Sequence, residues 1–135
     1  MTVSFTVPGN PVPKGRPRVT QYGTYTPKKT ADYEKLVLRC WQAQSGQRLP
    51  PDTPLLASIT AYFPIPKSLS KKKRAELDGT FHLKRPDADN IAKAVLDSLN
   101  GHAYADDSAV QIDRSFKLYS IEPRVEVCIR TEGTP

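Results

Sequence analysis

Cysteine, histidine and long apolar runs are all scarce in this chain of 135 residues. Cys40 and Cys128 lie far apart and outside any CxxC or Cys/His ligand spacing, which argues against a zinc finger and a disulfide framework and predicts two reduced thiols. His82 and His102 are isolated in sequence, so we expect ordinary solvated loop side chains. No apolar run approaches the roughly 18 residues of a membrane-spanning helix, so we expect no membrane association.

The beginning of the sequence, MTVSFTVPGNPVP, lacks both a charged leader and a continuous apolar stretch. We therefore expect no signal peptide and an intracellular, cytoplasmic location. The length suits one domain over residues 1–135 with a core of its own.

Acidic residues are nearly absent from the first 50 positions, which hold eight Lys and Arg against two acids. Residues 51–135 hold twelve of each, so the net charge of +6 arises entirely in the first 50. A local positive field favours polyanions through the release of counterions from phosphates. Simple solubility charge is the alternative explanation.

Hydrophobic periodicity predicts an α+β domain, with helices packed on a mixed β-sheet in the order β-α-β-α-α-β-β. The expected strands are 3–7, 55–66, 109–120 and 123–131, the last two forming a hairpin or meander. The expected helices are 29–44, capped by Thr30 and closed by Gly46, then 68–78, capped by Ser68 or Ser70, and a third from 89 or 90 to 100. Trp41 is expected in the core.

Basic residues cluster in three places where a phosphate backbone could be bound. Between residues 8 and 27 we expect an extended, proline-stiffened loop, in which cations interleave with Tyr22 and Tyr25 as suits phosphate contacts and base stacking. The expected DNA-binding residues are Lys14, Arg16, Arg18, Lys71, Lys72, Lys73, Arg74, Lys84 and Arg85. A loop without a partner and a solvated helix remain the alternatives for the first two clusters.

The stretch KRPDADNIAKAVLDSLNG, residues 84–101, places Asp87 and Asp89 at the start of the third helix. Asp89 could be only an N-cap, worth ~1 kcal/mol, or only the partner of Lys93 in an ion pair worth ~0.3 kcal/mol. Neither role explains Asp87, because two carboxylates ~5 Å apart repel by roughly 3 kcal/mol at an effective dielectric near 20. A hard divalent cation such as Mg²⁺ would relieve that repulsion.

A further ligand is expected from the acidic pair Asp106 and Asp107, which lies in a turn just before a strand. A helix followed by an antiparallel return could carry this turn back toward Asp89. An ordinary solvent-exposed turn is the alternative explanation.

PDADNIAKAVLDSLNG followed by YADDSAVQID resembles the RusA family of Holliday junction resolvases, through DxDN, a Lys after two further residues, an Asp four residues later and a DD turn. The specific part covers about residues 84–113. The resemblance implies a metal-dependent endodeoxyribonuclease of bacterial, prophage or phage origin that acts as a homodimer on branched DNA, chiefly four-way junctions, by paired symmetric nicks in recombination and repair. It assigns Mg²⁺, with Mn²⁺ as a substitute, to Asp87, Asp89 and Asp107, and a catalytic role to Lys93.

Within the same resemblance, Asn90, Asp97 and Asp106 are expected to support the metal ligands rather than bind the metal. The cation run between Ser68 and Gly79 departs from compact members of the family, which puts the details of the DNA surface in doubt. Two other functions stay open. A catalytically silent branched-DNA-binding module would tolerate loss of Asp89, and a phosphohydrolase of small esters would bind with little salt dependence.

Overall fold

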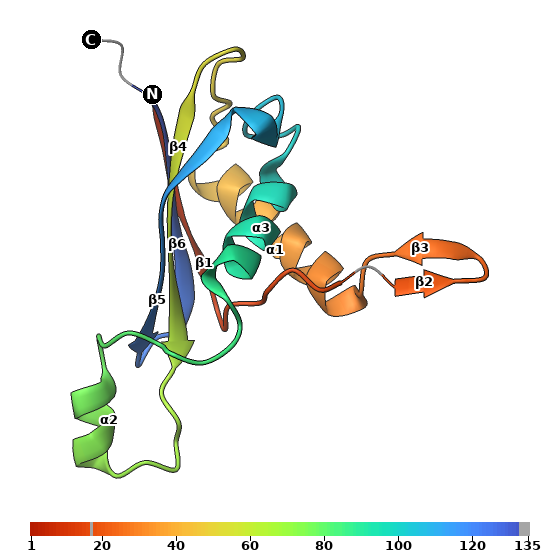
Figure 1. Ribbon diagram of the computed structural model, residues 1–135. Coiled ribbons are helices and arrows are strands. Elements are labelled where there is room, and N and C mark those ends of the chain that lie inside the picture. The colour runs from red at the N-terminus through yellow and green to blue at the C-terminus, as the bar shows by residue number, and fades with distance from the viewer. Residues whose placement is uncertain (17, 133–135) are drawn as a thin grey trace.

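Two helices, α1 (Lys28–Gln44) and α3 (Ala88–Leu99), lie together on one face of a four-stranded mixed sheet (Figure 1). The computed structural model describes residues 1–16 and 18–132. The strands are β1 (Thr2–Pro8), β4 (Leu55–Pro64), β5 (Val110–Ser120) and β6 (Arg124–Thr131), in the spatial order β1-β6-β4-β5. Among the strand pairs of this sheet in the described chain, β4–β5 is parallel and the others are antiparallel. The predicted α+β class with a mixed sheet is confirmed.

The expected pairing of the last two strands is wrong, because β4 lies between β5 and β6. β6 buries alternate residues along its length and pairs on both sides, with β1 and with β4. β5 is largely exposed and forms the edge of the sheet. The short link 121–123 therefore crosses the end of β4 instead of closing a hairpin.

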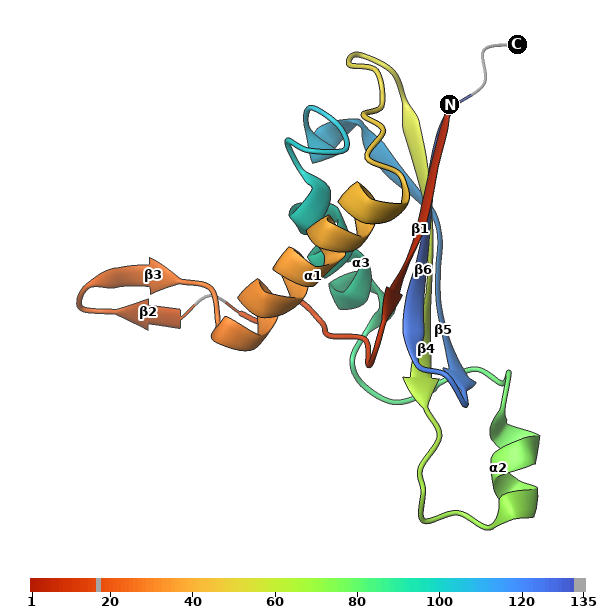
Figure 2. The same ribbon diagram turned by 180° about the vertical axis from the view of Figure 1, so that it is seen from behind.

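Part of the expected irregular loop is an antiparallel ribbon of β2 (Arg18–Thr20) and β3 (Gly23–Tyr25). The turn between them is built locally: the Tyr22 N–H donates to Thr20 Oγ1, which donates to the Gly23 carbonyl, both at 3.2 Å. Gly23 has φ of +121°, a backbone conformation that glycine tolerates best. The ribbon projects away from the sheet and helices (Figures 1 and 2).

Helix α1 packs against β1 and α3 through an apolar stripe that contains Tyr33, Val37 and Trp41. Trp41 is 7% exposed, which confirms its predicted place in the core. Thr30 does not cap this helix, since the helix begins at Lys28 and Thr30 Oγ1 instead accepts the Gly15 N–H at 2.9 Å. That bond fastens the segment before β2 to α1.

Helix α2 (Lys71–Leu77) begins as expected after Ser70, whose side chain accepts the Lys73 N–H at 3.2 Å. None of its residues is buried. The helix lies beyond the end of the sheet, well away from the β2–β3 ribbon (Figures 1 and 2). This placement leaves both expected alternatives open for the cations of α2, a solvated helix and a nucleic-acid-facing patch.

The predicted core line of α3 is confirmed, with Ile91, Val95 and Leu99 all buried. The expectation of a solvated His82 is wrong: its ring is stacked on Phe63 at a centroid distance of 4.1 Å, and the residue is 9% exposed. Cys40 and Cys128 form no disulfide among the described residues. In the described part of the chain no helix combines the length and apolar character needed to cross a membrane.

Candidate active site

Asp87 and Asp89 stand at the start of α3, where a helix presents unsatisfied N–H groups. The helix begins at Ala88, slightly earlier than predicted, so Asp87 takes the N-cap position and Asp89 lies in the first turn. The Asp87 side chain makes no capping hydrogen bond, and its carbonyl accepts the N–H groups of Asn90 and Ile91 at 3.1 and 3.3 Å. The proposal that Asp89 is only an N-cap is therefore wrong.

Both carboxylates are exposed, and neither makes a hydrogen bond or ion pair with any residue that the structure describes. Lys93, one turn after Asp89, is exposed and likewise has no ion pair within the described chain. The alternative explanation of Asp89 as the ion-pair partner of Lys93 is therefore wrong, since the described residues show no such pair. Two acids and one cation thus face solvent side by side without neutralising each other.

Asp97, two turns beyond Asp89, is bound by Lys14 from the segment before β2. Lys14 Nζ lies 3.1 Å from Asp97 Oδ2 and 2.6 Å from Glu34 Oε1 on α1. Its backbone N–H donates to the Asn90 carbonyl at 3.0 Å. Burial would lower the pKa of Lys14, but the hydrogen bonds to Glu34 and Asp97 outweigh it and raise the pKa. Lys14 therefore acts in this structure as a bridge between α1 and α3.

Asp106 and Asp107 lie at the other end of α3, where the 3₁₀ turn η1 (Asp107–Ala109) leads into β5. The Asp107 N–H donates to Asn100 Oδ1 at 3.1 Å, and the Ser108 N–H donates to Asp106 Oδ1 at 3.1 Å. The Ser108 bond lowers the pKa of Asp106. Partial burial, the adjacent Asp106 and the charge of Asp97 raise the pKa of Asp107.

The acidic residues therefore form two groups, one at each end of α3. Asp89 and Asp97 are separated by two turns, or about 12 Å of helical rise, and the DD turn lies beyond Asp97. The expected return toward Asp89 does not occur, because β5 starts next to the end of α3 and runs back alongside it (Figure 1). Among the described residues, no three His, Cys, Asp or Glu side chains are gathered closely enough to hold a metal ion.

Asp87 and Asp89 nevertheless fit a hard divalent cation in their chemistry. Carboxylate oxygens are the ligands that Mg²⁺ prefers, and Mg²⁺ commonly uses only one or two of them while keeping several waters. Because neither carboxylate is bonded to a described side chain, both can turn toward such an ion without breaking an existing contact. A surface pocket of about 370 Å³ opens beside Asp87, lined by Pro13, Lys14, Arg85, Pro86, Asp87 and Asn90.

Of the cations assigned to DNA binding, Lys14 and Arg85 line this pocket, whereas those of α2 lie beyond the end of the sheet (Figure 1). Arg16, Lys84, Arg85 and the run 71–73 are exposed, and none of them pairs with an acid in the described parts of the chain. Arg74 is half-buried, with its Nε unpaired among the described residues. The side chain of Arg18 lies outside the described residues. Most of this basic surface is therefore available to an anion.

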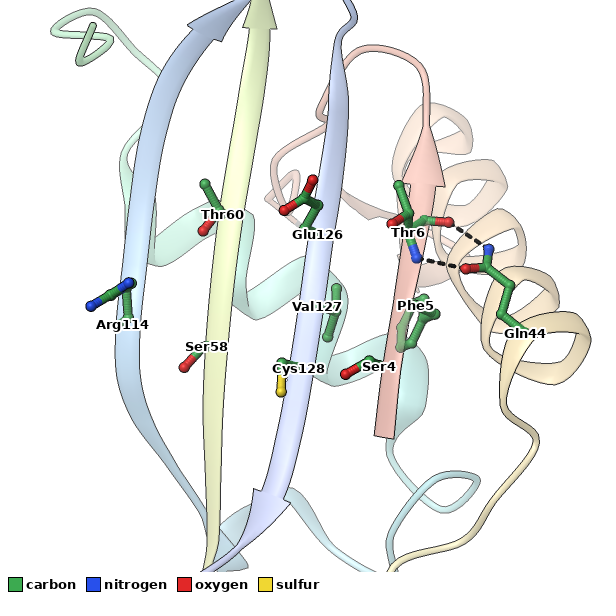
Figure 3. Close-up of a pocket in the computed structure, with 10 residues that line it drawn as sticks. All are labelled: Ser4, Phe5, Thr6, Gln44, Ser58, Thr60, Arg114, Glu126, Val127 and Cys128. Atoms are coloured by element: carbon green, nitrogen blue, oxygen red, sulfur yellow. Dashed lines mark hydrogen bonds between the residues drawn. The ribbon is translucent and has the colours of Figure 1, made fainter. Parts of the chain in front are cut away.

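A second pocket, of about 400 Å³, lies on the opposite, uncovered face of the sheet (Figure 3). Its lining is mostly hydroxyls and small side chains, with Glu126 as the one carboxylate, bonded to Arg124 at 2.9 Å. Gln44 closes its rim by bonding both the N–H and the carbonyl of Thr6. This pocket is separated by the sheet from the acidic residues of α3, so it is not part of the candidate site.

Residues that sequence reasoning missed hold the site together. Glu34 completes the Lys14 bridge, and Ser115 and Lys117 bond the backbone around Asp87. Alternation along β5 could have placed Ser115 and Lys117 on the same face as Tyr119, toward the helices. Nothing in the sequence indicated which backbone groups they would meet.

The sequence matches the family model described as Endodeoxyribonuclease RusA over residues 8–130. It is also 37% identical over 140 residues to "Uncharacterized protein YqaN" of Bacillus subtilis (strain 168), covering 95% of each chain. The matched span contains the segment before β2, the start of α3 and the DD turn.

Proposed function

Because the chain belongs to the endodeoxyribonuclease RusA family, we propose that it is a divalent-metal-dependent nuclease that resolves four-way DNA junctions by paired nicks. The observation that carries this proposal is the pair of exposed carboxylates at the start of α3. Asp87 and Asp89 have no partner among the described residues, although the chain carries six excess positive charges. Such a pair is explained if it binds a cation that a DNA phosphate then meets.

Asp87 and Asp89 would hold Mg²⁺, with Mn²⁺ as a substitute, and Asp107 is proposed as a further ligand. When bound, the ion would lower the pKa of a water molecule and offset charge on the phosphate. Asp107 lies at the far end of α3, so its participation requires movement of the DD turn or a second copy of the chain. Asn90, Asp97 and Asp106 are proposed to support these ligands, with Asp97 doing so through Lys14.

Lys93 is proposed to face the scissile phosphate. Its ammonium is one helical turn from Asp89 and has no ion pair in the described chain, so its charge is available to a new anion. Preorganised positive charge next to the phosphate stabilises the charge that develops in the transition state.

DNA binding is proposed to use the exposed cations around the pocket and on α2, with the β2–β3 ribbon as a second contact. Tyr22 at the ribbon turn is 90% exposed, and Tyr25 is also exposed, so both rings are free to stack on unpaired bases. Among the cations of the basic set whose side chains the structure describes, Lys14 has its charge matched, by Glu34 and Asp97. Its contribution to DNA affinity should be the smallest.

A homodimer with two-fold symmetry is proposed for the active form. A four-way junction has near two-fold symmetry, so two copies of the site would face two opposed strands. Paired nicks on those strands would resolve the junction.

The test is cleavage of a synthetic four-way junction in Mg²⁺ by the native protein, Asp89→Asn and Asp32→Asn. Asp32 is a matched control, since it is also an exposed aspartate on a helix without an ion pair in the described chain. We expect Asp89→Asn to bind the junction and to lose cleavage by at least ~100-fold, the scale of removing one charge-stabilising group. Asp32→Asn should cleave normally.

A catalytically silent DNA-binding module is the second candidate. One observation favours it, namely that the described residues gather no three metal-ligating side chains. Junction binding by the native protein without cleavage in Mg²⁺ or Mn²⁺ would establish it over the nuclease.

A further inference from the structure

The chain between α2 and α3 runs antiparallel along the outer edge of β5. The Gly79 N–H donates to the Tyr119 carbonyl and the Tyr119 N–H to the Thr80 carbonyl, each at 2.9 Å. The His82 N–H then donates to the Lys117 carbonyl, also at 2.9 Å. Backbone pairing thus aligns this segment with β5 as far as His82.

Beyond His82 the contact continues through the side chain of Lys117. Lys117 Nζ donates to the Lys84 carbonyl at 2.6 Å and to the Pro86 carbonyl at 2.8 Å. Pro86 immediately precedes Asp87. One ammonium group therefore binds two carbonyls of the segment that leads into the acidic start of α3.

Ser115 completes the arrangement on the other side of Asp87. Its Oγ donates to the Ala88 carbonyl at 3.1 Å. The carbonyls that precede and follow Asp87 are therefore both bound by side chains of the same strand.

The register of the sheet explains why these two side chains point toward α3. Ser115 is paired with Ile59 and Lys117 with Ala61. Ile59 and Ala61 are buried beneath the helices, so their neighbours on β5 share that face. Arg114 is paired with Ser58 and lies on the opposite face.

An ammonium group suits this position because it offers three donors and no acceptor. The surrounding groups are carbonyls, and no described acid pairs with Lys117. The neighbouring His82 is buried against Phe63. Burial, followed by the charges of Lys117 and Lys84, lowers the pKa of His82, so the imidazole adds no competing charge at neutral pH.

We propose that Lys117 is a positioning residue for the nuclease reaction: by binding the carbonyls of Lys84 and Pro86 it fixes Asp87, and with it the carboxylate pair, against β5. Ser115 holds the same backbone from the other side. This inference rests on the proposed function, since it names what keeps the metal-binding carboxylates in place.

The decisive variant is Lys117→Met, which keeps the length of the side chain and removes its donors. A displacement of about 1 Å in a reacting group can cost roughly 100-fold in rate, so we expect cleavage to fall by ~100-fold. Metal-free junction binding should stay within about twofold of native, because the proposed role is not a phosphate contact. Lys117→Arg retains charge and donors and should recover part of the loss.

Two readouts are independent of cleavage. Amide hydrogen exchange over residues 83–90 should become roughly tenfold faster in Lys117→Met, because local opening is no longer resisted. Mn²⁺ binding, followed by electron paramagnetic resonance, should weaken by ~10-fold or more, the usual scale for loss of a group that orients a metal ligand. Arg114→Met is the matched control and should change neither quantity.

Faster exchange, weaker Mn²⁺ binding and lost cleavage with intact DNA binding would support the proposal. Native-like cleavage in Lys117→Met would overturn it. Parallel losses of cleavage and DNA binding with unchanged hydrogen exchange would also overturn it, because they would indicate a phosphate contact.

If Lys117→Met does not fold, as judged by circular dichroism, Ser115→Ala tests the same proposal by the same three readouts, with smaller expected effects. If the native protein cleaves no branched DNA, the proposed function fails, while exchange and Mn²⁺ binding still decide whether Lys117 holds Asp87.

Discussion

Replacing Lys14 by methionine should destabilise the fold, although Lys14 lies in the basic segment that the sequence assigns to DNA. Its Nζ bonds Glu34 on α1 and Asp97 on α3 at 2.6 and 3.1 Å, and its side chain is only 18% exposed. Hydrogen bonds to charged groups contribute about 1.5–3 kcal/mol each when sheltered, and exposed ion pairs contribute about 0–1 kcal/mol.

The replacement also leaves two carboxylates facing each other. Both oxygens bond the same nitrogen, so they are at most about 6 Å apart, where two unit charges repel by roughly 3 kcal/mol at an effective dielectric near 20. Rotation of the side chains into solvent will relieve part of this repulsion. We therefore expect Lys14→Met to lower the free energy of unfolding by about 2–3 kcal/mol, and the melting temperature by ~10 °C.

Urea unfolding at pH 7 measures this loss, with Lys28→Met as the control because Lys28 is exposed at the start of α1 without an ion pair in the described chain. Adding Asp97→Asn to Lys14→Met should recover part of the stability, since it removes one of the two facing charges. A Lys14→Met protein within about 0.5 kcal/mol of native, the range of ordinary surface changes, would show that the Lys14 bridge does not stabilise the fold.

The loss of unfolding free energy in Lys14→Met should depend on pH, because the pKa of Lys14 is raised in the folded protein. A lysine whose folded pKa lies above its unfolded value of about 10.4 contributes its stability fully below that pH and loses it as pH rises through the folded pKa. The difference in unfolding free energy between native and Lys14→Met should accordingly be constant near neutrality and shrink as pH rises above about 10.

Three further outcomes are expected. Replacing lysines 71–73 of α2 by glutamine should reduce the salt dependence of junction binding by about one unit of log–log slope for each phosphate that is no longer neutralised, and an unchanged slope would place the DNA elsewhere. Tyr22→Ala should weaken junction binding by about 1–3 kcal/mol without altering the melting temperature, whereas equal affinity would exclude stacking. Because the pKa of His82 is lowered in the folded state, its contribution to the free energy of unfolding should be complete above about pH 6.5 and decline as pH falls below that value. In urea titrations His82→Phe should show a weaker pH dependence of stability, and a pH profile identical to that of the native protein would contradict this role of His82.

Local pattern was enough to predict most of the regular structure. The alternation in residues 55–64 and the Ile91, Val95 and Leu99 spacing each reflect burial of one face, which the sequence records directly. The β2–β3 ribbon was missed because its strands have only three residues each and none of the side chains described there is buried. Its formation depends on the turn at Thr20–Gly23 rather than on hydrophobic periodicity.

Long-range pairing was harder to predict. The two-residue link between the expected strands 109–120 and 123–131 suggested a hairpin. In the structure β5 and β6 both pair with β4, and no local feature of the link at 121–123 indicates this. Thr30 is a residue type that often caps helices, but its Oγ1 accepts the Gly15 N–H instead, because the proline-rich segment lies against α1. His82 is buried for a related reason, since pairing of residues 79–82 with β5 carries it onto Phe63.

The acidic start of α3 was predictable as a unit because Asp87, Asp89 and Lys93 are close in sequence. Their surroundings were not. Asp97 was expected to support the metal ligands, and only the fold showed that Lys14 binds its carboxylate. The DD turn was expected near Asp89, but the direction of β5 sets it at the opposite end of α3.

The proposed function depends above all on the carboxylates at the start of α3, which would hold the metal ion needed for cleavage of branched DNA. It can be tested with a four-way junction in which each strand is labelled in turn, incubated in Mg²⁺ with the native protein, Asp87→Asn or Asp89→Asn at concentrations where all three bind. We expect nicks at symmetric positions on two opposed strands with the native protein and none with either variant. Symmetric nicks that persist in both variants would show that the metal for cleavage is bound elsewhere.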